Sequence, residues 1–436
     1  MIVRAVPGLH PFGRVAWAAA RHGLPCALKL PDATSGSRML VGCDPVRVVR
    51  GDSVDELATA WAEQRALWNV SDVARVPVGV GFLSYELGRF FERIRGGRLA
   101  SSPWPLVEFR FYDAFIACDG ASGPGEIWAR DEGAARRIAG QLLLPRPDPV
   151  TVPLPESFAR LEEQEPSSLH LGAVSRALDY IAAGDIYQVN LARRLGCASS
   201  TSPAEAPGCS LFLRLEEAAP APYALWMADG EHGTALIGNS PECFLRRSMD
   251  GVVETSPIKG TRPRDSESPP GRDASLLLSS PKDRAEHVMI VDLERNDLGR
   301  VCQTGSVEVS DLCRVLTLPT VHHLESTVRG RLRPEVGLAE LLRATFPGGS
   351  VTGAPKIRAM EIIEELEPAR RGPYTGATGW LGAAGDLDLA VAIRTALIRD
   401  ERLTLWVGGG IVADSSPESE LAETWDKAQA FSRVLG

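Results

Sequence analysis

Hydrophobic residues recur along this chain with two different periods. In residues 54–67 the apolar side chains of Leu57, Ala60, Trp61 and Leu67 share one face, which predicts an amphipathic helix. Short apolar runs bounded by polar residues or glycine predict strands instead. Before residue 145 such runs cover residues 78–83, 106–112 and 114–118.

The same two patterns continue after residue 168. Helices are predicted at residues 169–183, 282–297, 337–345, 355–367 and 417–434. Strands are predicted at residues 186–194, 224–227, 234–238, 243–246, 387–398 and 403–407. This mixture predicts an α+β fold in which large, mostly antiparallel β-sheets pack as a sandwich with flanking helices.

A proline-rich stretch at residues 144–155 interrupts these patterns. Its sequence, LPRPDPVTVPLP, favours an extended conformation, which is typical of a linker. We therefore divide the chain into an N-terminal region at residues 1–145, a linker at 146–168 and a second region at 169–436. No chemistry is visible in the first region, which we interpret as scaffold.

Composition narrows the classes of function. At 436 residues the chain can bury a substantial core, and its net charge of −9 without a basic run disfavours nucleic acid or an anionic membrane surface as partner. No apolar stretch approaches about 18 residues, so no transmembrane helix is expected. The eight cysteines are scattered without a C-x-x-C pair, which is typical of a reduced, cytoplasmic protein.

One lysine carries the strongest chemical signal. Of the 47 basic residues only five are lysines, so a lysine that remains is expected where arginine cannot substitute. Lys259 lies between Pro257 and a Gly-Thr turn, where a helical surface lysine is not expected. Unlike arginine, a desolvated lysine can lose its proton and attack carbon. The alternative is a loop lysine that contacts an anion.

Two predicted helices each carry acidic residues three positions apart. Asp283 and Glu286 share a face of the first helix, and Glu420, Glu423 and Lys427 share a face of the second. Two facing carboxylate pairs form a hard-oxygen site of the kind that Mg²⁺ prefers. The alternative is a solvated helix face on which Glu423 and Lys427 form an i,i+4 ion pair.

Three further features point to an anionic ligand or to acid catalysis. A strand that runs into Gly408, Gly409 and Gly410 predicts a turn with exposed backbone N–H groups. Arg394 lies in the apolar run 387–398 and needs an anionic partner, from either the protein or a ligand. Glu242, 17 residues before Lys259, could protonate a leaving group or be an ordinary turn residue.

Taken together, these motifs resemble the chorismate-utilising enzyme family. The matching segments occur in family order at residues 184–191, 240–242, 257–261, 283–299, 321–326, 346–356, 372–377, 392–394 and 408–423. The N-terminal region resembles that family's N-terminal domain only loosely. The resemblance implies a fold like that of anthranilate synthase component I, with residues 169–436 as the chorismate-binding catalytic region.

Two positions separate the branches of that family. Lys259 occupies the place where anthranilate synthases usually have alanine, and Gln188 occupies the place where isochorismate and salicylate synthases have a water-activating lysine. The resemblance therefore implies the aminodeoxychorismate synthase branch. Anthranilate formation is the alternative, and the water-adding isochorismate and salicylate routes are less favoured.

The resemblance also implies roles for individual residues. The amine of Lys259 would attack C2 of chorismate while Glu242 protonates the departing C4 hydroxyl, and ammonia would then displace the lysine to give 4-amino-4-deoxychorismate. His323 would lie near the reacting ring. The residues implied in binding the substrate are Arg394, Tyr374, Lys427, Thr352 and the amides of Gly408, Gly409 and Gly410.

The metal and the partner follow from the same resemblance. Glu286 and Glu423 would hold Mg²⁺, with Asp283 and Glu420 nearby. The chain contains no recognisable glutamine amidotransferase domain with a nucleophilic cysteine. A separate glutaminase subunit is therefore expected to supply the ammonia, in a heterodimer.

Overall fold

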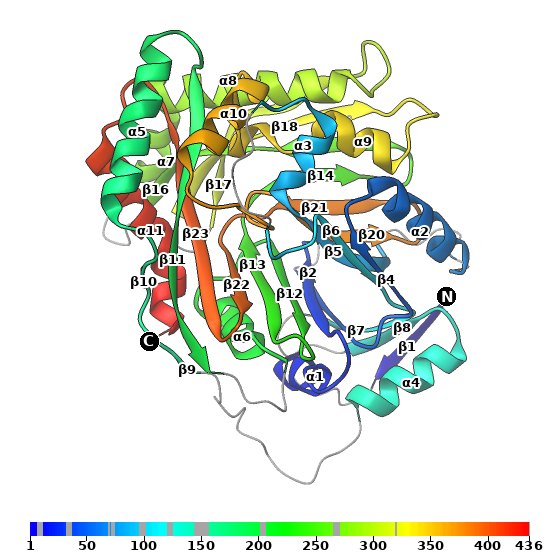
Figure 1. The fold of residues 1–436 in the computed structure, drawn as a ribbon. Helices are drawn as coiled ribbons and strands as arrows, with labels where there is room; N and C mark the ends of the chain where they lie inside the picture. The colour runs from blue at the N-terminus through cyan, green and yellow to red at the C-terminus, as the bar shows by residue number, and fades with distance from the viewer. Residues whose placement is uncertain are drawn as a thin grey trace.

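The architecture comes from a computed structural model of the chain (Figure 1). The structure describes residues 1–6, 12–31, 37–68, 70, 75–95, 102–119, 125–143, 157–200, 206–264, 271–318 and 321–435. The proline-rich stretch at residues 144–155 lies outside the described residues, whereas residues 157–168 of the predicted linker are described. None of the described helices is both long and apolar enough to span a membrane.

The described residues form two sheets, and the larger of them has thirteen strands. Eleven form a path in the order β1 (Ile2–Val6), β8 (Gly125–Ala129), β7 (Ala114–Asp119), β3 (Arg38–Gly42), β2 (Cys26–Leu30), β12 (Tyr223–Asp229), β13 (Thr234–Ser240), β22 (Thr395–Arg399), β23 (Arg402–Ile411), β11 (Gln188–Ser200) and β10 (Glu162–Glu163). Two short strands, β9 (Ser157–Phe158) and β19 (Gly353–Ala354), also pair with β11.

The second sheet has ten strands. Its path runs through β16 (Ile258–Pro263), β18 (Val321–Arg331), β15 (Val252–Ser256), β14 (Cys243–Arg247), β21 (Leu387–Val391), β20 (Ala377–Gly382), β5 (Pro77–Leu83), β6 (Val107–Phe111) and β4 (Arg47–Gly51), and β17 (Glu308–Thr317) pairs with β18. The paired strands that adjoin the site are antiparallel, for example β11 with β23 and β16 with β18. The predicted α+β fold is confirmed.

Helices cover both sheets (Figure 1). The described helices are α1 (Phe12–Ala19), α2 (Val54–Ala66), α3 (Gly88–Phe91), α4 (Glu132–Leu142), α5 (Ser167–Ala182), α6 (Cys209–Ala218), α7 (Arg272–Leu278), α8 (Pro281–Gly299), α9 (Leu338–Thr345), α10 (Lys356–Leu366) and α11 (Pro417–Leu435), with the 3₁₀ turns η1 (Tyr85–Leu87) and η2 (Gly349–Val351). The predicted helices are all present, and each end lies within two residues of its predicted position.

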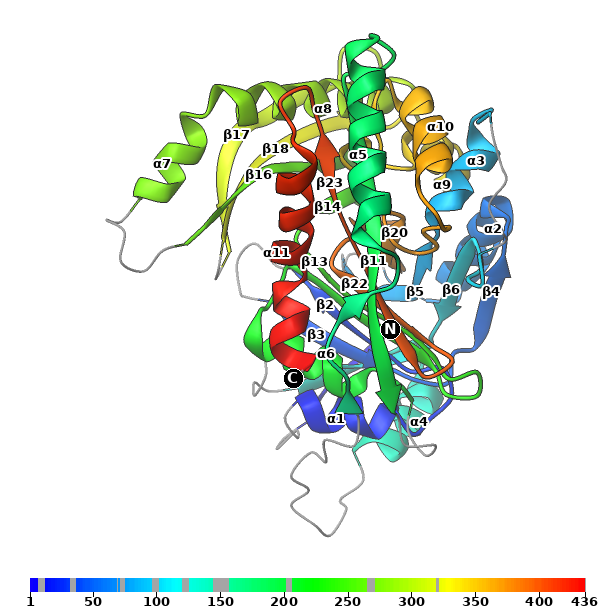
Figure 2. The same cartoon turned by 60° about the vertical axis from the view of Figure 1, so that its left-hand side comes forward.

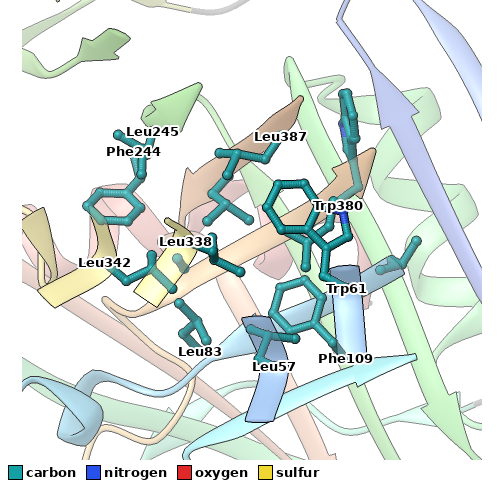
Figure 3. Packing of buried hydrophobic residues seen from close by; sticks show 14 of the residues in the cluster. Leu57, Trp61, Leu83, Phe109, Phe244, Leu245, Leu338, Leu342, Trp380 and Leu387 are labelled. Atoms are coloured by element: carbon teal, nitrogen blue, oxygen red, sulfur yellow. The ribbon is translucent and has the colours of Figure 1, made fainter. Parts of the chain in front are cut away.

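The largest apolar cluster joins the two sheets and the helices α2 and α9. Figure 3 shows Trp61 of α2, Phe109 of β6, Trp380 of β20 and Leu338 of α9 packed around one centre. The thirteen-stranded sheet contributes residues such as Leu225 to the same cluster. Because apolar surface from both sheets is removed from water together, this core fixes their relative positions.

Strands from both sides of the predicted linker share each sheet. β2 pairs with β12 in the larger sheet, and β5 pairs with β20 in the smaller one. Each sheet therefore contains strands from before and after residue 145. The division into a region at 1–145, a linker at 146–168 and a region at 169–436 stays a prediction.

Two local predictions were wrong, and both concern the site. Residues 387–398 are not one strand, because β21 lies in the ten-stranded sheet and β22 in the thirteen-stranded sheet. Arg394 lies at the crossing between them with a backbone φ of 50°. Gly408, Gly409 and Gly410 form no turn, since they lie within β23 and pair with Ala192, Leu191 and Asn190 of β11.

Candidate active site

Lys259 of β16 lies close to β23, and it interacts electrostatically with Glu286 of α8 and Glu423 of α11. Figure 2 shows α11 alongside β23, with α8 passing above the first turns of α11. Lys259 lies on β16 opposite Leu324 of β18. A Cβ placed on Gly410 would lie 2.9 Å from the Lys259 amine and 3.1 Å from Nε2 of Gln188. The bare strand backbone at Gly410 therefore makes room for both side chains.

The electrostatic surroundings of Lys259 favour loss of its proton. Burial lowers the pKa of Lys259, and the charge of Lys427 lowers it further, whereas Glu286, Glu242 and Glu423 oppose the shift. None of the salt bridges among the described residues involves Lys259. An amine without a fixed counter-ion in a desolvated position is more readily neutral, as nucleophilic attack requires.

Glu242 lies in the link between β13 and β14 and is 3% exposed. Its backbone is fixed at both ends, because its N–H donates to Oγ of Ser240 (3.2 Å) and its carbonyl accepts from the N–H of Val391 (3.0 Å). Its carboxyl accepts a hydrogen bond from the hydroxyl of Ser350. Burial raises the pKa of Glu242 to about 7, although Ser350 and Lys259 oppose the rise. Such a carboxyl can carry a proton near neutral pH.

His323 and Arg394 form a second polar pair close to Lys259. Nδ1 of His323 lies 3.1 Å from the carbonyl oxygen of Gly260, and Nε2 lies 3.3 Å from Nη2 of Arg394. Because the guanidinium only donates, Nε2 accepts and Nδ1–H donates to Gly260. Burial, aided by the charge of Arg394, lowers the pKa of His323 to about 4, so the ring is neutral.

Arg394 has no carboxylate partner among the described residues. Burial lowers its pKa, and Glu242 is the acid that opposes this shift. The sequence left open whether the partner of Arg394 comes from the protein or from a ligand. Since no described carboxylate pairs with it, its donors are available to an anionic ligand.

The acidic residues of α8 and α11 also act on Lys259, since Glu286 and Glu423 are among the charges that raise its pKa. A Cβ on Gly409 would lie 3.1 Å from Oε2 of Glu420 and 3.6 Å from Oε1 of Glu423. Lys427 lies 2.7 Å from Oε1 of Glu423 and donates to the carbonyl of Gly408 at 2.6 Å. The i,i+4 ion pair considered from the sequence is therefore present. Lys427 holds a backbone carbonyl of β23 as well as a carboxylate.

The carboxylates of α8 and α11 affect one another electrostatically. Burial raises the pKa of Glu286, and Asp283 and Glu420 add to the rise. Burial also raises the pKa of Glu420, with a further rise caused by Glu423. For Glu423 the effect of burial is outweighed by Lys427, Lys259 and Lys282, so its pKa falls.

This acidic set has donor chemistry that fits Mg²⁺. Its oxygens are hard ligands, and a divalent cation reduces the electrostatic repulsion between neighbouring carboxylates. In this structure the carboxylate oxygens of α8 and α11 are too far apart for three of them to bind one ion together. Among the described residues, only His22, Cys43 and Asp44 bring three possible metal-ligand atoms within 4.8 Å of one another. The carboxylates of α8 and α11 would have to close around an ion.

Tyr374 and Thr352 are buried as well. The Tyr374 ring stacks on Trp406 of β23 at a centroid distance of 5.7 Å, and burial raises its pKa. The hydroxyl of Thr352 donates to the carbonyls of Gly348 (3.0 Å) and Gly349 (3.3 Å). Thr352 thereby holds the η2 turn, and its predicted contact with substrate stays a prediction.

The sequence interpretation missed a buried arginine that shapes this region. Arg371 is 1% exposed, pairs with Glu367 and donates to the carbonyl of Asn190 (2.8 Å). Its own backbone N–H donates to Glu86 at 2.7 Å, so η1 from the N-terminal region holds the loop that carries Tyr374. The i,i+4 spacing of Glu367 and Arg371 was the available signal, but it is equally typical of an exposed helix end.

Comparisons with known proteins identify the family of the chain. The family described as chorismate binding enzyme matches residues 27–433. Aminodeoxychorismate synthase component 1 of Klebsiella aerogenes is 40% identical over 361 residues, which are 82% of this chain and 76% of that protein. Anthranilate synthase component 1 of Streptomyces coelicolor is 46% identical over 381 residues, 81% of this chain and 71% of that protein.

A solved structure shares the fold. The crystal structure of anthranilate synthase component I from Streptococcus pneumoniae superposes with a TM-score of 0.76 at 29% identity, covering 92% of this chain and 93% of that one. The similar proteins thus include some named aminodeoxychorismate synthase and others named anthranilate synthase.

Proposed function

Since the chain belongs to the chorismate binding enzyme family, we propose that it aminates chorismate at C4 with ammonia to give 4-amino-4-deoxychorismate. The observation that carries this proposal is the position of Lys259. Its amine faces the bare backbone of Gly410, beside Gln188, and interacts electrostatically with Glu286 of α8 and Glu423 of α11. Alanine at this position, which is usual in the anthranilate branch, offers no nucleophile.

The first half of the reaction makes one bond and breaks one. The neutral amine of Lys259 attacks C2, the ring double bond shifts, and the C4–O bond breaks. Glu242 gives its proton to the leaving hydroxyl, which departs as water. The products are a lysine secondary ammonium at C2 and the carboxylate of Glu242. The pKa of Glu242, raised by burial to about 7, suits this donation.

The second half restores both residues. Ammonia attacks C4, the double bond shifts back, and the C2–N bond breaks to release Lys259 as a neutral amine. The new C4 ammonium passes one proton to Glu242, which is again protonated. The sum is chorismate plus ammonia giving 4-amino-4-deoxychorismate plus water, with no redox step.

The substrate is a dianion, and the site offers matching positive charge. The guanidinium of Arg394, free of described carboxylates, is placed to bind one carboxylate, with neutral His323 beside it. Mg²⁺, held by Glu286 and Glu423 with Glu420 and Asp283 nearby, would supply positive charge for the other. A separate glutaminase subunit is proposed to deliver ammonia, because the similar proteins are named as component 1.

Anthranilate formation is the second candidate, because anthranilate synthase component 1 of Streptomyces coelicolor is 46% identical. One experiment separates the two. Purified protein is incubated with chorismate, Mg²⁺ and an ammonium salt, and the products are resolved by liquid chromatography. We expect 4-amino-4-deoxychorismate. Fluorescent anthranilate with equimolar pyruvate would contradict the proposal, and isochorismate formed without ammonia would place the chain in the water-adding branch.

A further inference from the structure

A second buried carboxyl lies behind Glu242. Glu294 is on the inner face of α8 and is 3% exposed. One of its oxygens accepts the backbone N–H of Gly349 at 2.8 Å, and the other lies 3.5 Å from the hydroxyl of Thr255. Glu294 has no assigned part in the reaction above. Burying an ionised carboxyl costs free energy unless hydrogen bonds or an ion pair compensate it.

The η2 turn connects this carboxyl to the proposed general acid. Gly349 is bound by Glu294, and the next residue, Ser350, donates its hydroxyl to Glu242. A Cβ on Gly349 would lie 2.6 Å from Cδ2 of Leu293 and 3.1 Å from Oε1 of Glu294. The turn is therefore pressed against α8, and its hydrogen bond to Glu294 fixes the direction in which Ser350 points.

The charge of Glu294 is not neutralised by an ion pair. Asp297, one turn further along α8, pairs with Lys356, and both side chains are buried (4% and 12% exposed). No lysine or arginine among the described residues forms a salt bridge with Glu294. Burial raises the pKa of Glu294 to about 7, and Asp297 adds to the rise while Lys356 opposes it. Residues 346–356 thus carry both η2 and Lys356, which pairs with Asp297.

We propose that Glu294 is a positioning residue that holds Ser350 against Glu242 and, through its charge, sets the pH range in which Glu242 keeps its proton. The inference rests on the proposed function, in which Glu242 protonates the leaving hydroxyl. Because electrostatic coupling is mutual, the effect of Glu242 on Glu294 implies an equal effect in return. The charged groups that face the two carboxyls are Lys259 on β16, Glu325 on β18, Arg394 between β21 and β22, Asp297 on α8 and Lys356 on α10.

The test uses two variants with opposite expected effects on the pH profile of kcat, measured with a constant concentration of free ammonia. Glu294→Gln keeps an acceptor for Gly349 and removes a negative charge that raises the pKa of Glu242. The alkaline limb of the profile, where kcat falls as Glu242 loses its proton, should therefore move to lower pH by about half a unit or more. Ser350→Ala removes a hydrogen bond that lowers the pKa of Glu242, so the limb should move to higher pH. Asp292→Asn, at an exposed carboxylate on the same helix, should leave the profile unchanged.

Plateau rates test the positioning role separately. Glu294→Ala frees the turn and should lower kcat about tenfold with KM unchanged, like Ser350→Ala, whereas Glu294→Gln should stay within about threefold of wild type. The double variant Glu294→Ala with Ser350→Ala should be no worse than either single variant, because both remove the same contact. The inference would be overturned if the losses of kcat in the double variant were additive. It would also be overturned if Glu294→Gln did not shift the pH profile of kcat.

The failure of the inference can be told apart from the failure of the proposed function. Glu242→Gln should abolish the alkaline limb in an otherwise folded protein. A wild-type protein without ammonia-dependent amination, or a Glu242→Gln variant that keeps the limb, would contradict the proposed function itself. Loss of the limb in Glu242→Gln, combined with no shift in Glu294→Gln, would contradict only the role of Glu294.

Discussion

The two sides of the site are built in opposite ways. On one side Glu242, Glu294 and His323 are almost completely buried, and hydrogen bonds from neighbouring elements hold them. On the other side Glu423 and Lys427 are partly exposed, with side-chain exposures of 52% and 35%, and they form an ion pair along one helix. The first arrangement fixes the protonation states of its side chains, whereas the second holds charged side chains in partial contact with solvent.

This difference separates two tasks. Burial shifts the pKa of Glu242 up and that of His323 down, so each is neutral over much of the range around pH 6. The exposed face keeps its carboxylates close to lysines, and such pairs can rearrange at little cost when a cation and a dianion arrive. Charged residues on both sides affect the pKa of Lys259.

The sharpest way to break this comparison is to remove Lys259. Lys259→Ala should lower ammonia-dependent amination of chorismate by about a thousandfold or more while the thermal midpoint stays close to wild type, because the nucleophile is lost and no ion pair is broken. Lys259→Arg should be equally inactive, since guanidinium stays protonated. Steady-state product analysis of both variants is the measurement, and wild-type rates in the arginine variant would refute the nucleophilic role.

Glu242→Gln tests the buried side through both rate and stability. The amination rate should fall by about a hundredfold or more, because the leaving hydroxyl is no longer protonated. The folded-state pKa of about 7 lies above the unfolded value near 4.3, so the wild type loses stability as the pH rises through this interval.

The stability effect has a definite sign. Glu242→Gln should be more stable than wild type at pH 8, by up to about 3 kcal/mol, and equally stable at pH 4. Denaturant unfolding at the two pH values checks this. Equal stability at pH 8 would mean that Glu242 is not desolvated in the folded protein.

The sequence could predict the residues of the exposed side better than the geometry of the buried side. Carboxylates three apart on a helix are visible as a pattern, and α8 and α11 confirm the helices that carry them. The crossing at Arg394 was not visible, because β21 and β22 are both apolar and buried, and periodicity does not report that the chain changes sheets.

Glu294 escaped notice for a related reason. It lies eight residues after Glu286 on α8 and looks like one more charged position of an amphipathic helix. Only the packing of η2 against α8 reveals that it is buried. Gly408, Gly409 and Gly410 were predicted to form a turn, whereas they lie within a paired strand, where a Cβ on Gly410 would meet Lys259 and Gln188.

On the exposed side, removing a proposed metal ligand should alter cation dependence before it alters folding. Glu286→Ala and Glu423→Ala should each raise the Mg²⁺ concentration for half-maximal activity by about tenfold or more, because each removes one hard oxygen ligand. Asp292→Asn serves as the control on α8. An unchanged Mg²⁺ titration in both alanine variants would remove these residues from the metal site.

The glycines of β23 offer the smallest change and the finest test. Gly410→Ala should displace Lys259 and Gln188, which are the flexible groups that its Cβ meets, and lower kcat about tenfold with little loss of stability. Gly408→Ala would meet the carbonyl oxygen of Leu191 at 2.4 Å and should destabilise the sheet. Gly140→Ala on α4, where no atom lies within 4 Å, is the matched control in thermal unfolding and activity assays.

The central claim is that the amine of Lys259 bonds covalently to the substrate. Wild-type protein is mixed with chorismate and Mg²⁺ in the absence of ammonia, quenched in acid, and analysed by intact and peptide mass spectrometry. We predict an added mass equal to chorismate minus water, localised to Lys259 and absent from Lys259→Ala. Ammonia-dependent formation of 4-amino-4-deoxychorismate by Lys259→Ala at the wild-type rate, with no adduct on the wild-type protein, would contradict the claim.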